Sequence, residues 1–243
     1  MGWEASHENG ISMNFAIIAA GEGSRLAQEG VKWPKPLVRL HGVALVDRLM
    51  EVFVRQGATS ISIIVNETMT EVQEHVRQMQ LPVPLHLLVK STPSSMHSFY
   101  ELSRQFDGSD LCLTTVDTIF REEEFGDYIR AFQAQPELDG LMAVTDFVDD
   151  EKPLYVQTNE ALDITGFLDQ PGDCRYVSGG IYCLRNRAQA VLDRCVAQGM
   201  SRMRNYQRQL VAEGLHLKAH PFAKIIDVDH AEDIQKADQF LQS

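Results

Sequence analysis

A short apolar run that ends in a glycine-rich turn constrains the fold of this chain more than any other feature. Residues 15–19 are apolar, and they lead into Ala20-Gly21-Glu22-Gly23-Ser24-Arg25-Leu26. The pattern predicts a buried strand and then a turn in which two residues lack Cβ atoms, so that the backbone can close around phosphate oxygens. Arg25 adds a fixed positive charge, and Lys35 in Trp33-Pro34-Lys35-Pro36-Leu37 adds another. An anion site at the end of the first strand is therefore expected.

Two better-known glycine-rich turns also bind phosphates, and the sequence departs from both. A dinucleotide-binding turn needs glycine at the sixth position of G-x-G-x-x-G, where this chain has Leu26. A P-loop needs Gly-Lys-Ser/Thr after four intervening residues, and no such run occurs. An ordinary strand-to-helix turn would explain the two glycines but neither Arg25 nor the Pro-Lys-Pro sequence.

The whole stretch resembles the signature of the sugar-1-phosphate nucleotidyltransferases, enzymes that make NDP-sugars and related activated alcohols. Their pattern is a strand, then Ala-Ala-Gly-x-Gly-x-Arg-Leu, then Pro-Lys-Pro-Leu, and it matches residues 19–26 and 34–37. The resemblance implies a GT-A-like nucleotidyltransferase fold and catalytic roles for Arg25 and Lys35. It also implies that the nucleotide is bound by four residues of the turn: Ala20, Gly21, Gly23 and Ser24.

The composition narrows the classes of partner. The chain has 243 residues, of which 44% are hydrophobic, and a formal net charge of −12. This charge argues against nucleic acid and against an anionic membrane surface as partners. Because an NTP is itself an anion, an acidic protein that binds one needs local cations, and Mg²⁺ held by carboxylates is the expected supplier.

Location and domain organisation follow from other simple patterns. Four cysteines (Cys112, Cys174, Cys183 and Cys195) show no zinc-like spacing, which favours buried thiols in a reducing cytoplasm. No apolar stretch approaches the ~18 residues of a membrane span. Residues 1–12 are polar and lack a signal-peptide core, so a disordered tail or start-site extension is expected there. One nucleotidyltransferase domain is expected over residues 13–243.

The hydrophobic periodicity predicts an α/β fold. Strand and helix patterns alternate in the first half, which predicts a Rossmann-like, mostly parallel sheet sandwiched by helices. Beyond about Asp139, strand-like runs follow one another with little helix between them, which predicts antiparallel additions; they cover residues 141–145, 154–157, 162–168 and 176–184. Two helices, two short strands and a final helix over residues 231–241 complete the pattern.

Carboxylates stand at two expected strand ends. Asp117 closes the strand 111–116, and residues 116–120 resemble the family's Gly-Asp-Asn-Ile-Phe, whose aspartate binds magnesium. Taken alone, Asp117 is better explained as a helix N-cap or turn residue, and the glycine-rich loop is what favours the metal role. Asp227 and Asp229 point to the same side of an extended chain before the last helix. The resemblance implies that Mg²⁺ is held by Asp117 with Asp227 or Asp229, and the sequence leaves both choices open.

Further segments are candidates for binding the base and the acceptor. Ser94 and Ser95 open a helix whose amides and hydroxyls could meet an anion or a base edge. Residues 167–171 and 177–182 are similar to the family's sugar-binding stretch. The resemblance implies acceptor binding by Asp169 and by the Ser178-Gly179-Gly180 turn. The lysine that meets the acceptor phosphate in the family is Gln170 here, and Lys224 is the expected substitute.

The expected reaction is a Mg²⁺-dependent transfer of a nucleoside monophosphate from an NTP to a sugar-1-phosphate, with release of pyrophosphate. The run Ser94–Phe99 is closer to the Asn-Ser-x-x-Ser-Phe of choline-phosphate cytidylyltransferases, so choline phosphate or a similar phosphorylated alcohol is an alternative acceptor. A non-catalytic nucleotide-sensing subunit of the same fold is a second alternative. The base, the acceptor and any homo-oligomer remain open.

Overall fold

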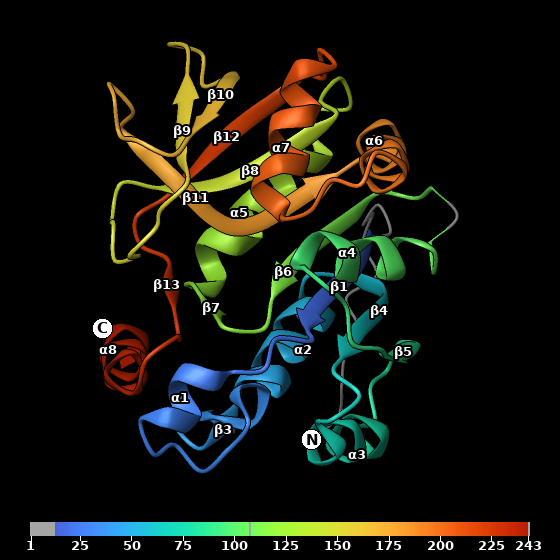
Figure 1. Ribbon diagram of the computed structural model, residues 1–243, viewed down its shortest axis with the longest axis vertical. Coiled ribbons are helices and arrows are strands. Elements are labelled where there is room, and N and C mark those ends of the chain that lie inside the picture. Colours follow the sequence, from blue (N-terminus) through green and yellow to red (C-terminus); the bar gives the residue numbers. More distant parts are fainter. Residues whose placement is uncertain (1–12, 107, 243) are drawn as a thin grey trace.

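The computed structural model describes residues 13–106 and 108–242, which gather around one large twisted sheet (Figure 1). The tail expected over residues 1–12 lies outside this part of the chain. Within the described residues, no helix combines the length and the apolar character that a membrane crossing requires.

The first half of the chain forms the parallel part of the sheet. Strand β1 (Met13–Ala19) lies between β4 (Ala58–Val65) and β6 (Leu111–Thr115) and is parallel to both. On the far side of β4, β5 (Leu85–Val89) is also parallel. Parallel strands end at the same edge of a sheet, so the loops after β1, β4, β5 and β6 meet there. The predicted parallel core is confirmed.

The second half adds antiparallel strands, as predicted. Strand β11 (Tyr176–Leu184) is antiparallel to β6, to β8 (Gly140–Thr145) and to β9 (Tyr155–Thr158). Strand β10 (Ile164–Leu168) pairs antiparallel with β9, whereas β12 (Leu217–Phe222) runs parallel to β8. The result is a sheet of nine strands among the described residues.

Two small strand pairs lie outside this sheet. One joins β2 (Arg39–Leu40) to β3 (Val43–Ala44). The other joins β7 (Thr118–Ile119) to β13 (Ile226–Asp227), with Asp227 opposite Thr118. This second pair joins the segment after β6 to the segment before the last helix. It therefore brings the two predicted carboxylate segments together.

Helices cover both faces of the sheet because the sheet strands are apolar on both sides. In β1, Phe15 and Ile17 join one core cluster and Ala16 and Ile18 the other. The first cluster packs against α2 (Leu45–Arg55), α3 (Thr70–Gln78), α5 (Glu122–Gln133) and α8 (Ala231–Gln242). The second packs against α4 (Ser95–Ser103), α6 (Asn186–Ala197) and α7 (Met203–Ala212).

Helix α5 is an element that the sequence analysis did not predict. Its buried residues Phe125, Tyr128, Ile129 and Phe132 recur at helical spacing, so the signal is present in the sequence. The ring of Phe125 lies 6.3 Å from that of Phe15, and Phe53 of α2 stacks on Phe15 at 4.5 Å. Truncating such a buried ring to alanine costs about 3–5 kcal/mol, so this cluster holds α2 and α5 firmly against β1.

Candidate active site

The glycine-rich loop after β1 leads into the short helix α1 (Ser24–Gln28), and its shape depends on Gly23. Gly23 has φ 59° and ψ 30°, a left-handed conformation that costs little only for glycine. A Cβ atom at Gly23 would lie 3.2 Å from the Cβ atom of Lys35. Gly23 thus allows Lys35 to approach the loop closely.

Lys35 lies between Pro34 and Pro36 and is the first residue of a short 3₁₀ helix (Lys35–Leu37). Its Nζ atom lies 2.8 Å from Oδ2 of Asp117 and 2.6 Å from Oδ1 of Asp229. Only 16% of the Lys35 side chain is exposed. Desolvation alone would lower the pKa of Lys35, but the two carboxylates outweigh it and raise that pKa above its ordinary value. Lys35 is therefore a permanent cation that joins two predicted metal ligands.

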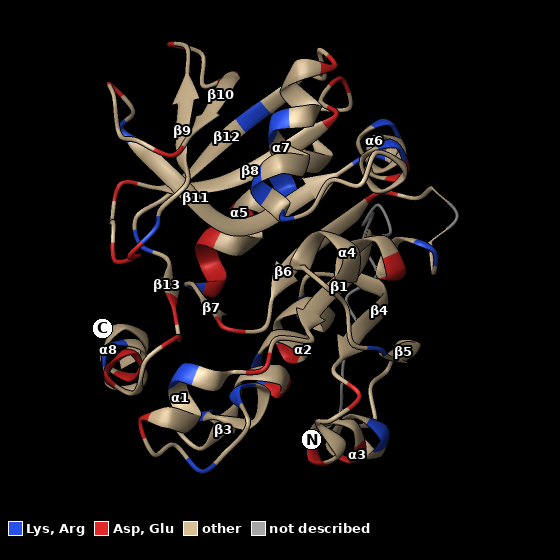
Figure 2. Ribbon diagram, in the orientation of Figure 1, with Lys and Arg blue, Asp and Glu red and all other residues tan. Residues whose placement is uncertain are grey.

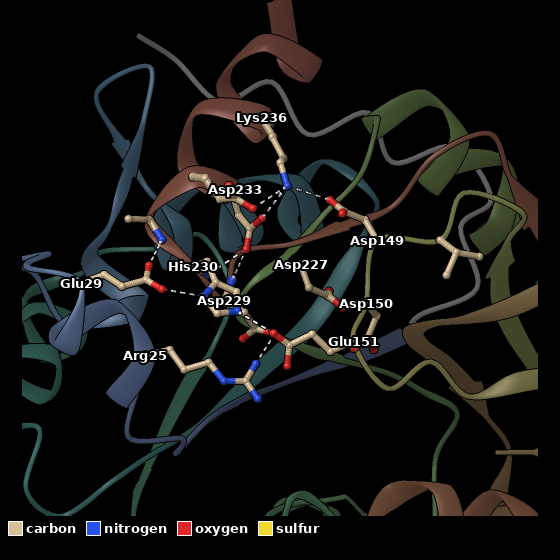
Figure 3. Close-up of a pocket in the computed structure, with 13 residues that line it drawn as sticks. Arg25, Glu29, Asp149, Asp150, Glu151, Asp227, Asp229, His230, Asp233 and Lys236 are labelled. Atoms are coloured by element: carbon tan, nitrogen blue, oxygen red, sulfur yellow. Dashed lines mark hydrogen bonds and ion pairs between the residues drawn. The ribbon is translucent and has the colours of Figure 1, made fainter. Parts of the chain in front are cut away.

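Arg25 lies on the open side of the same group (Figure 3). One of its terminal nitrogens is 3.8 Å from Oδ2 of Asp229, and 54% of its side chain is exposed. Partial burial opposes ionisation of Asp229, but the hydrogen bond from Lys35 and the charge of Arg25 hold its pKa below the ordinary value. An incoming anion could therefore reach Arg25 without displacing a buried ion pair.

Asp227 faces two of the neighbouring cavities. Desolvation by the surrounding protein and the like charges of Asp117, Asp229 and Asp150 raise the pKa of Asp227 well above its ordinary value. Asp227 is exposed to solvent, so repulsion by the neighbouring carboxylates is the main cause of this higher pKa. Of the three carboxylates Asp117, Asp227 and Asp229, Asp227 is the one that Lys35 does not neutralise.

The carboxylates of the site form an incomplete set of metal ligands. Among residues 13–106 and 108–242, no three or more His, Cys, Asp or Glu side chains converge as a complete metal site. Asp117 and Asp227 do line one cavity, and the repulsion felt by Asp227 is what a cation would relieve. The donor set therefore fits a cation held by few carboxylates together with ligand oxygens, as Mg²⁺ commonly is, rather than an all-protein cage.

A cavity of about 550 Å³ follows the strand ends, and we call it the nucleotide cavity. Its lining includes four predicted nucleotide-binding residues: Ala20, Gly21, Ser94 and Ser95. Gly23 and Ser24 are not among the lining residues, and Gly23 acts through Lys35, which is one of them. The hydroxyl of Ser94 caps α4 and accepts a hydrogen bond from the backbone N–H of Arg202 at 3.2 Å. Ser94 thereby ties the nucleotide cavity to α7.

A smaller cavity of about 310 Å³ adjoins it, and we call it the acceptor cavity. Three residues line both cavities: Ser95, Thr115 and Asp117. Ser178 and Gly180, two of the predicted acceptor residues, line the acceptor cavity. A group bound there and a phosphate chain bound in the nucleotide cavity would meet beside Asp117.

The other predicted acceptor residues lie elsewhere. A Cβ atom at Gly179 would point at Ile225 and at the backbone of Ala143. Asp169 pairs with Arg204 at 2.7 Å and with Arg208 at 2.8 Å. The ammonium of Lys224 lies over the ring of Phe147 at 4.3 Å, and Lys224 lines neither cavity.

Sequence reasoning missed several residues of the acceptor cavity: Asp150, Lys152, Tyr182, Arg202 and Gln207. The available signal was the basic run Arg202-Met203-Arg204 at the start of α7. Figure 2 shows basic residues at that end of α7 and acidic residues on the segment between β8 and β9 and on the segment before α8. The mouth of the site is therefore mixed in charge, although the chain as a whole is acidic.

Several known proteins resemble this chain in sequence or in fold. A curated relative, CMP-5'-(3-aminopropyl)phosphonate synthase of Streptomyces rubellomurinus, is 24% identical over 94% of this chain. This chain spans 38% of the length of that relative. Among solved structures, the inositol-1-phosphate CTP transferase from T. maritima superposes with a TM-score of 0.80 at 18% identity, covering 96% of this chain and 98% of the other.

A Bacillus anthracis protein described as a glucose-1-phosphate thymidylyltransferase superposes with a TM-score of 0.82 at 16% identity, covering 96% of each chain. At such identities the structural matches establish the fold, which is the predicted α/β nucleotidyltransferase fold. The sequence profile of the MobA-like NTP transferase domain matches residues 15–212, which is most of the chain. This protein therefore belongs to the MobA-like NTP transferase family.

Proposed function

We propose that this enzyme transfers a nucleoside monophosphate, with CTP as the first donor to test, to a small acceptor that bears a phosphate or phosphonate group. The observation that supports it most is the position of Lys35, which bridges Asp117 and Asp229 where the nucleotide and acceptor cavities meet. A cation held there by two carboxylates lies beside the place where an NTP would meet its acceptor.

The proposed step is an in-line displacement at the α-phosphorus of the NTP. An oxygen of the acceptor's phosphate or phosphonate forms the new bond to phosphorus, the bond to the β-phosphate oxygen breaks, and pyrophosphate leaves with that electron pair. Such transfers need positioning and neutralisation of charge, and no protein nucleophile. Lys35 and Arg25 would neutralise phosphate oxygens, and the backbone of the Gly21 turn would approach them closely.

Asp117 and Asp227 would hold Mg²⁺, because both line the acceptor cavity, whereas Asp229 pairs with Lys35 and Arg25 together. When bound, Mg²⁺ supplies positive charge to the phosphate oxygens and lowers their repulsion of the attacking oxygen. Asp227 would then no longer face Asp117 as an uncompensated like charge.

The acceptor and the base are inferred from the site together with the relatives. The relative from Streptomyces is named for a CMP-linked aminoalkylphosphonate, and the T. maritima protein for CTP. The displaced position of Lys224 and the mixed charge of the acceptor cavity favour a phosphorylated or phosphonate amine over the sugar-1-phosphate first expected.

A pyrophosphate-release assay tests the proposal. The full-length protein is incubated with Mg²⁺, each NTP in turn, and a panel of sugar phosphates, phosphorylated amino alcohols and aminoalkylphosphonates. Release that requires both an NTP and an acceptor, fastest with CTP, supports the assignment. NTP binding without acceptor-dependent release in any combination would contradict it and favour a nucleotide-sensing role.

A further inference from the structure

Gln207 is the buried polar residue that the reaction described above leaves unused. It lies on the inner face of α7, beside the buried Met203, Tyr206 and Leu210. Only 1% of Gln207 is exposed, and it lines the acceptor cavity. A hydrophobic residue would be the ordinary choice at such a position, so the amide needs a reason.

The amide of Gln207 is half-satisfied. Its Nε2 atom donates to the carbonyl oxygen of Met203 at 3.4 Å, whereas its Oε1 atom has no hydrogen-bond partner within the described part of the chain. Turning the amide over would set its oxygen against the Met203 carbonyl oxygen, so the nitrogen belongs where it is. The unpaired atom is therefore a hydrogen-bond acceptor beside a cavity, and burying it unpaired is unfavourable.

Neighbouring hydroxyl groups leave Oε1 free for a ligand. The hydroxyl of Tyr182 interacts with Ser178 and with the Gln207 side chain, but no hydrogen bond reaches Oε1 of Gln207 within the described part of the chain. Three side chains that line one cavity thus offer neutral polar atoms, from Ser178, Tyr182 and Gln207. Such a wall suits a ligand group that donates hydrogen bonds.

Three cationic side chains line the same cavity. Arg204 is paired with Asp169, but the side chains of Lys152 and Arg202 have no ion pair or hydrogen bond among the residues that the structure describes. Arg202 has φ 71°, an unfavourable backbone conformation for a residue with a side chain. These two cations can take the place of the lysine that Gln170 replaces.

The acceptor cavity keeps charges of both signs once internal pairs and the proposed metal ligands are set aside. Asp117 is paired with Lys35, and Arg204 with Asp169. One carboxylate, Asp150, and two cations, Lys152 and Arg202, remain to face a ligand, because Asp227 is a proposed ligand of Mg²⁺. A dianionic sugar phosphate complements only the cations, whereas a molecule with both an anionic and a cationic end complements the whole set.

We infer that Gln207 determines acceptor specificity by accepting a hydrogen bond from an ammonium group, while Arg202 and Lys152 bind the phosphoryl or phosphonyl end of the same molecule. The acceptor class is then a small aminoalkyl phosphate or phosphonate. This inference rests on the proposed function, because it takes the acceptor cavity to be the place where the second substrate binds.

Two matched probes, 3-aminopropylphosphonate and propylphosphonate, test this role because they differ only in the amine. With CTP and the full-length enzyme, kcat/KM should be at least about tenfold higher for the amine, since a site built for a donor rejects the analogue that lacks it. Gln207→Leu should lower kcat/KM for the amine by about 10–100-fold and change that for propylphosphonate by less than about threefold. The KM for CTP should stay the same.

Conservative and control variants distinguish recognition of the ammonium group by Gln207 from a role of Gln207 in packing. Gln207→Glu keeps an acceptor oxygen and should retain the preference for the amine. Arg202→Ala should raise KM for both phosphonates, whereas Arg77→Ala, at an exposed arginine of α3, should raise neither. Equal losses on both probes in Gln207→Leu would overturn the inference, because they would show a structural role.

Calorimetric titration of the two phosphonates into wild-type enzyme with a non-hydrolysable CTP analogue tests the inference even if a Gln207 variant misfolds. Tighter binding of the amine supports it, and equal binding overturns it. Turnover of sugar phosphates with neither phosphonate would also overturn it while leaving the nucleotidyl transfer intact. If no acceptor is turned over, the proposed function fails. The titration then tests binding of the two phosphonates to the acceptor cavity independently of turnover.

Discussion

The ammonium group of Lys35 lies 2.6 Å from a carboxylate oxygen of Asp229, although 194 residues separate the two in the chain. The same ammonium lies 2.8 Å from Asp117. The contact joins the start of the chain, the end of β6 and the segment before α8 at one point. Removal of Lys35 takes away the ammonium that Asp117 and Asp229 share, which makes Lys35 a sensitive target for substitution.

Lys35→Met should lower the rate of pyrophosphate release by about 10²-fold or more, because it removes a positioned cation next to the transferred group. Lys32→Met, at an exposed lysine nearby, is the matched control and should keep the wild-type rate. Both rates can be measured at saturating substrates. A Lys35→Met enzyme as fast as the control would show that Lys35 only stabilises the positions of Asp117 and Asp229.

Asp227→Asn should abolish turnover without loss of stability. The substitution removes a carboxylate that its like-charged neighbours destabilise, so the melting temperature should stay the same or rise by about 1–4 °C. Asp117→Asn should also abolish turnover. Activity and melting temperature are measured over a range of Mg²⁺ concentrations, with Asp193→Asn, at an exposed residue of α6, as control. Near-full activity of both variants at limiting Mg²⁺ would refute the assigned metal ligands.

Gly23→Ala tests the close approach between the glycine loop and Lys35. Gly23 and Gly30 both have positive φ, but only at Gly23 would a Cβ atom meet Lys35. Both alanine variants should lose about 1–2 kcal/mol of unfolding free energy through the backbone. Only Gly23→Ala should also lower kcat, by about tenfold or more, because it displaces Lys35, the proposed catalytic cation. Equal kcat values in the two variants would show that the conformation of the glycine loop does not determine the position of Lys35.

His220 should make stability depend on pH. Burial beside the rings of Tyr128 and Phe222 lowers the pKa of His220 below its ordinary value of 6.5. The unfolded chain therefore binds this proton at a higher pH than the folded chain does. The contribution of neutral His220 is present above pH 6.5 and is lost as the pH falls from 6.5 toward the lowered pKa.

Urea unfolding at a series of pH values measures this effect. His220→Phe should flatten the fall in unfolding free energy below pH 6.5. The same substitution at His86, an exposed residue of β5, should leave the fall as it is in the wild type. An unchanged profile in His220→Phe would mean that another group sets the acid limit.

The sequence predicted the parts of the site that lie close together along the chain. Apolar runs indicated the strands, and the motif around Gly21 and Lys35 indicated the family because its residue types are restricted by phosphate chemistry. The acceptor cavity was harder to predict because it depends on pairing between distant segments. Arg202 directly precedes α7 and Gln207 lies within it, and local patterns in the sequence do not show which helix faces a cavity.

Lys224 illustrates the same limit. A lysine three residues before Asp227 was a reasonable substitute for the family's phosphate-binding lysine. In the structure its ammonium lies over Phe147, with the ring of Phe240 also near at 5.5 Å. Side-chain direction at the end of a strand depends on the elements that pack there, which the sequence pattern does not specify. Its role as an acceptor ligand remains a prediction.

The most direct test of nucleotidyl transfer is ³¹P NMR of the full-length enzyme with CTP, Mg²⁺ and 3-aminopropylphosphonate. If an oxygen of the phosphonate attacks the α-phosphorus, the spectrum should develop a pair of mutually coupled resonances from the new P–O–P linkage, in step with free pyrophosphate. The same result with another acceptor would support the transfer but change its substrate. Unchanged CTP and acceptor resonances across the whole acceptor panel, or hydrolysis of CTP without the coupled pair, would contradict the assigned reaction.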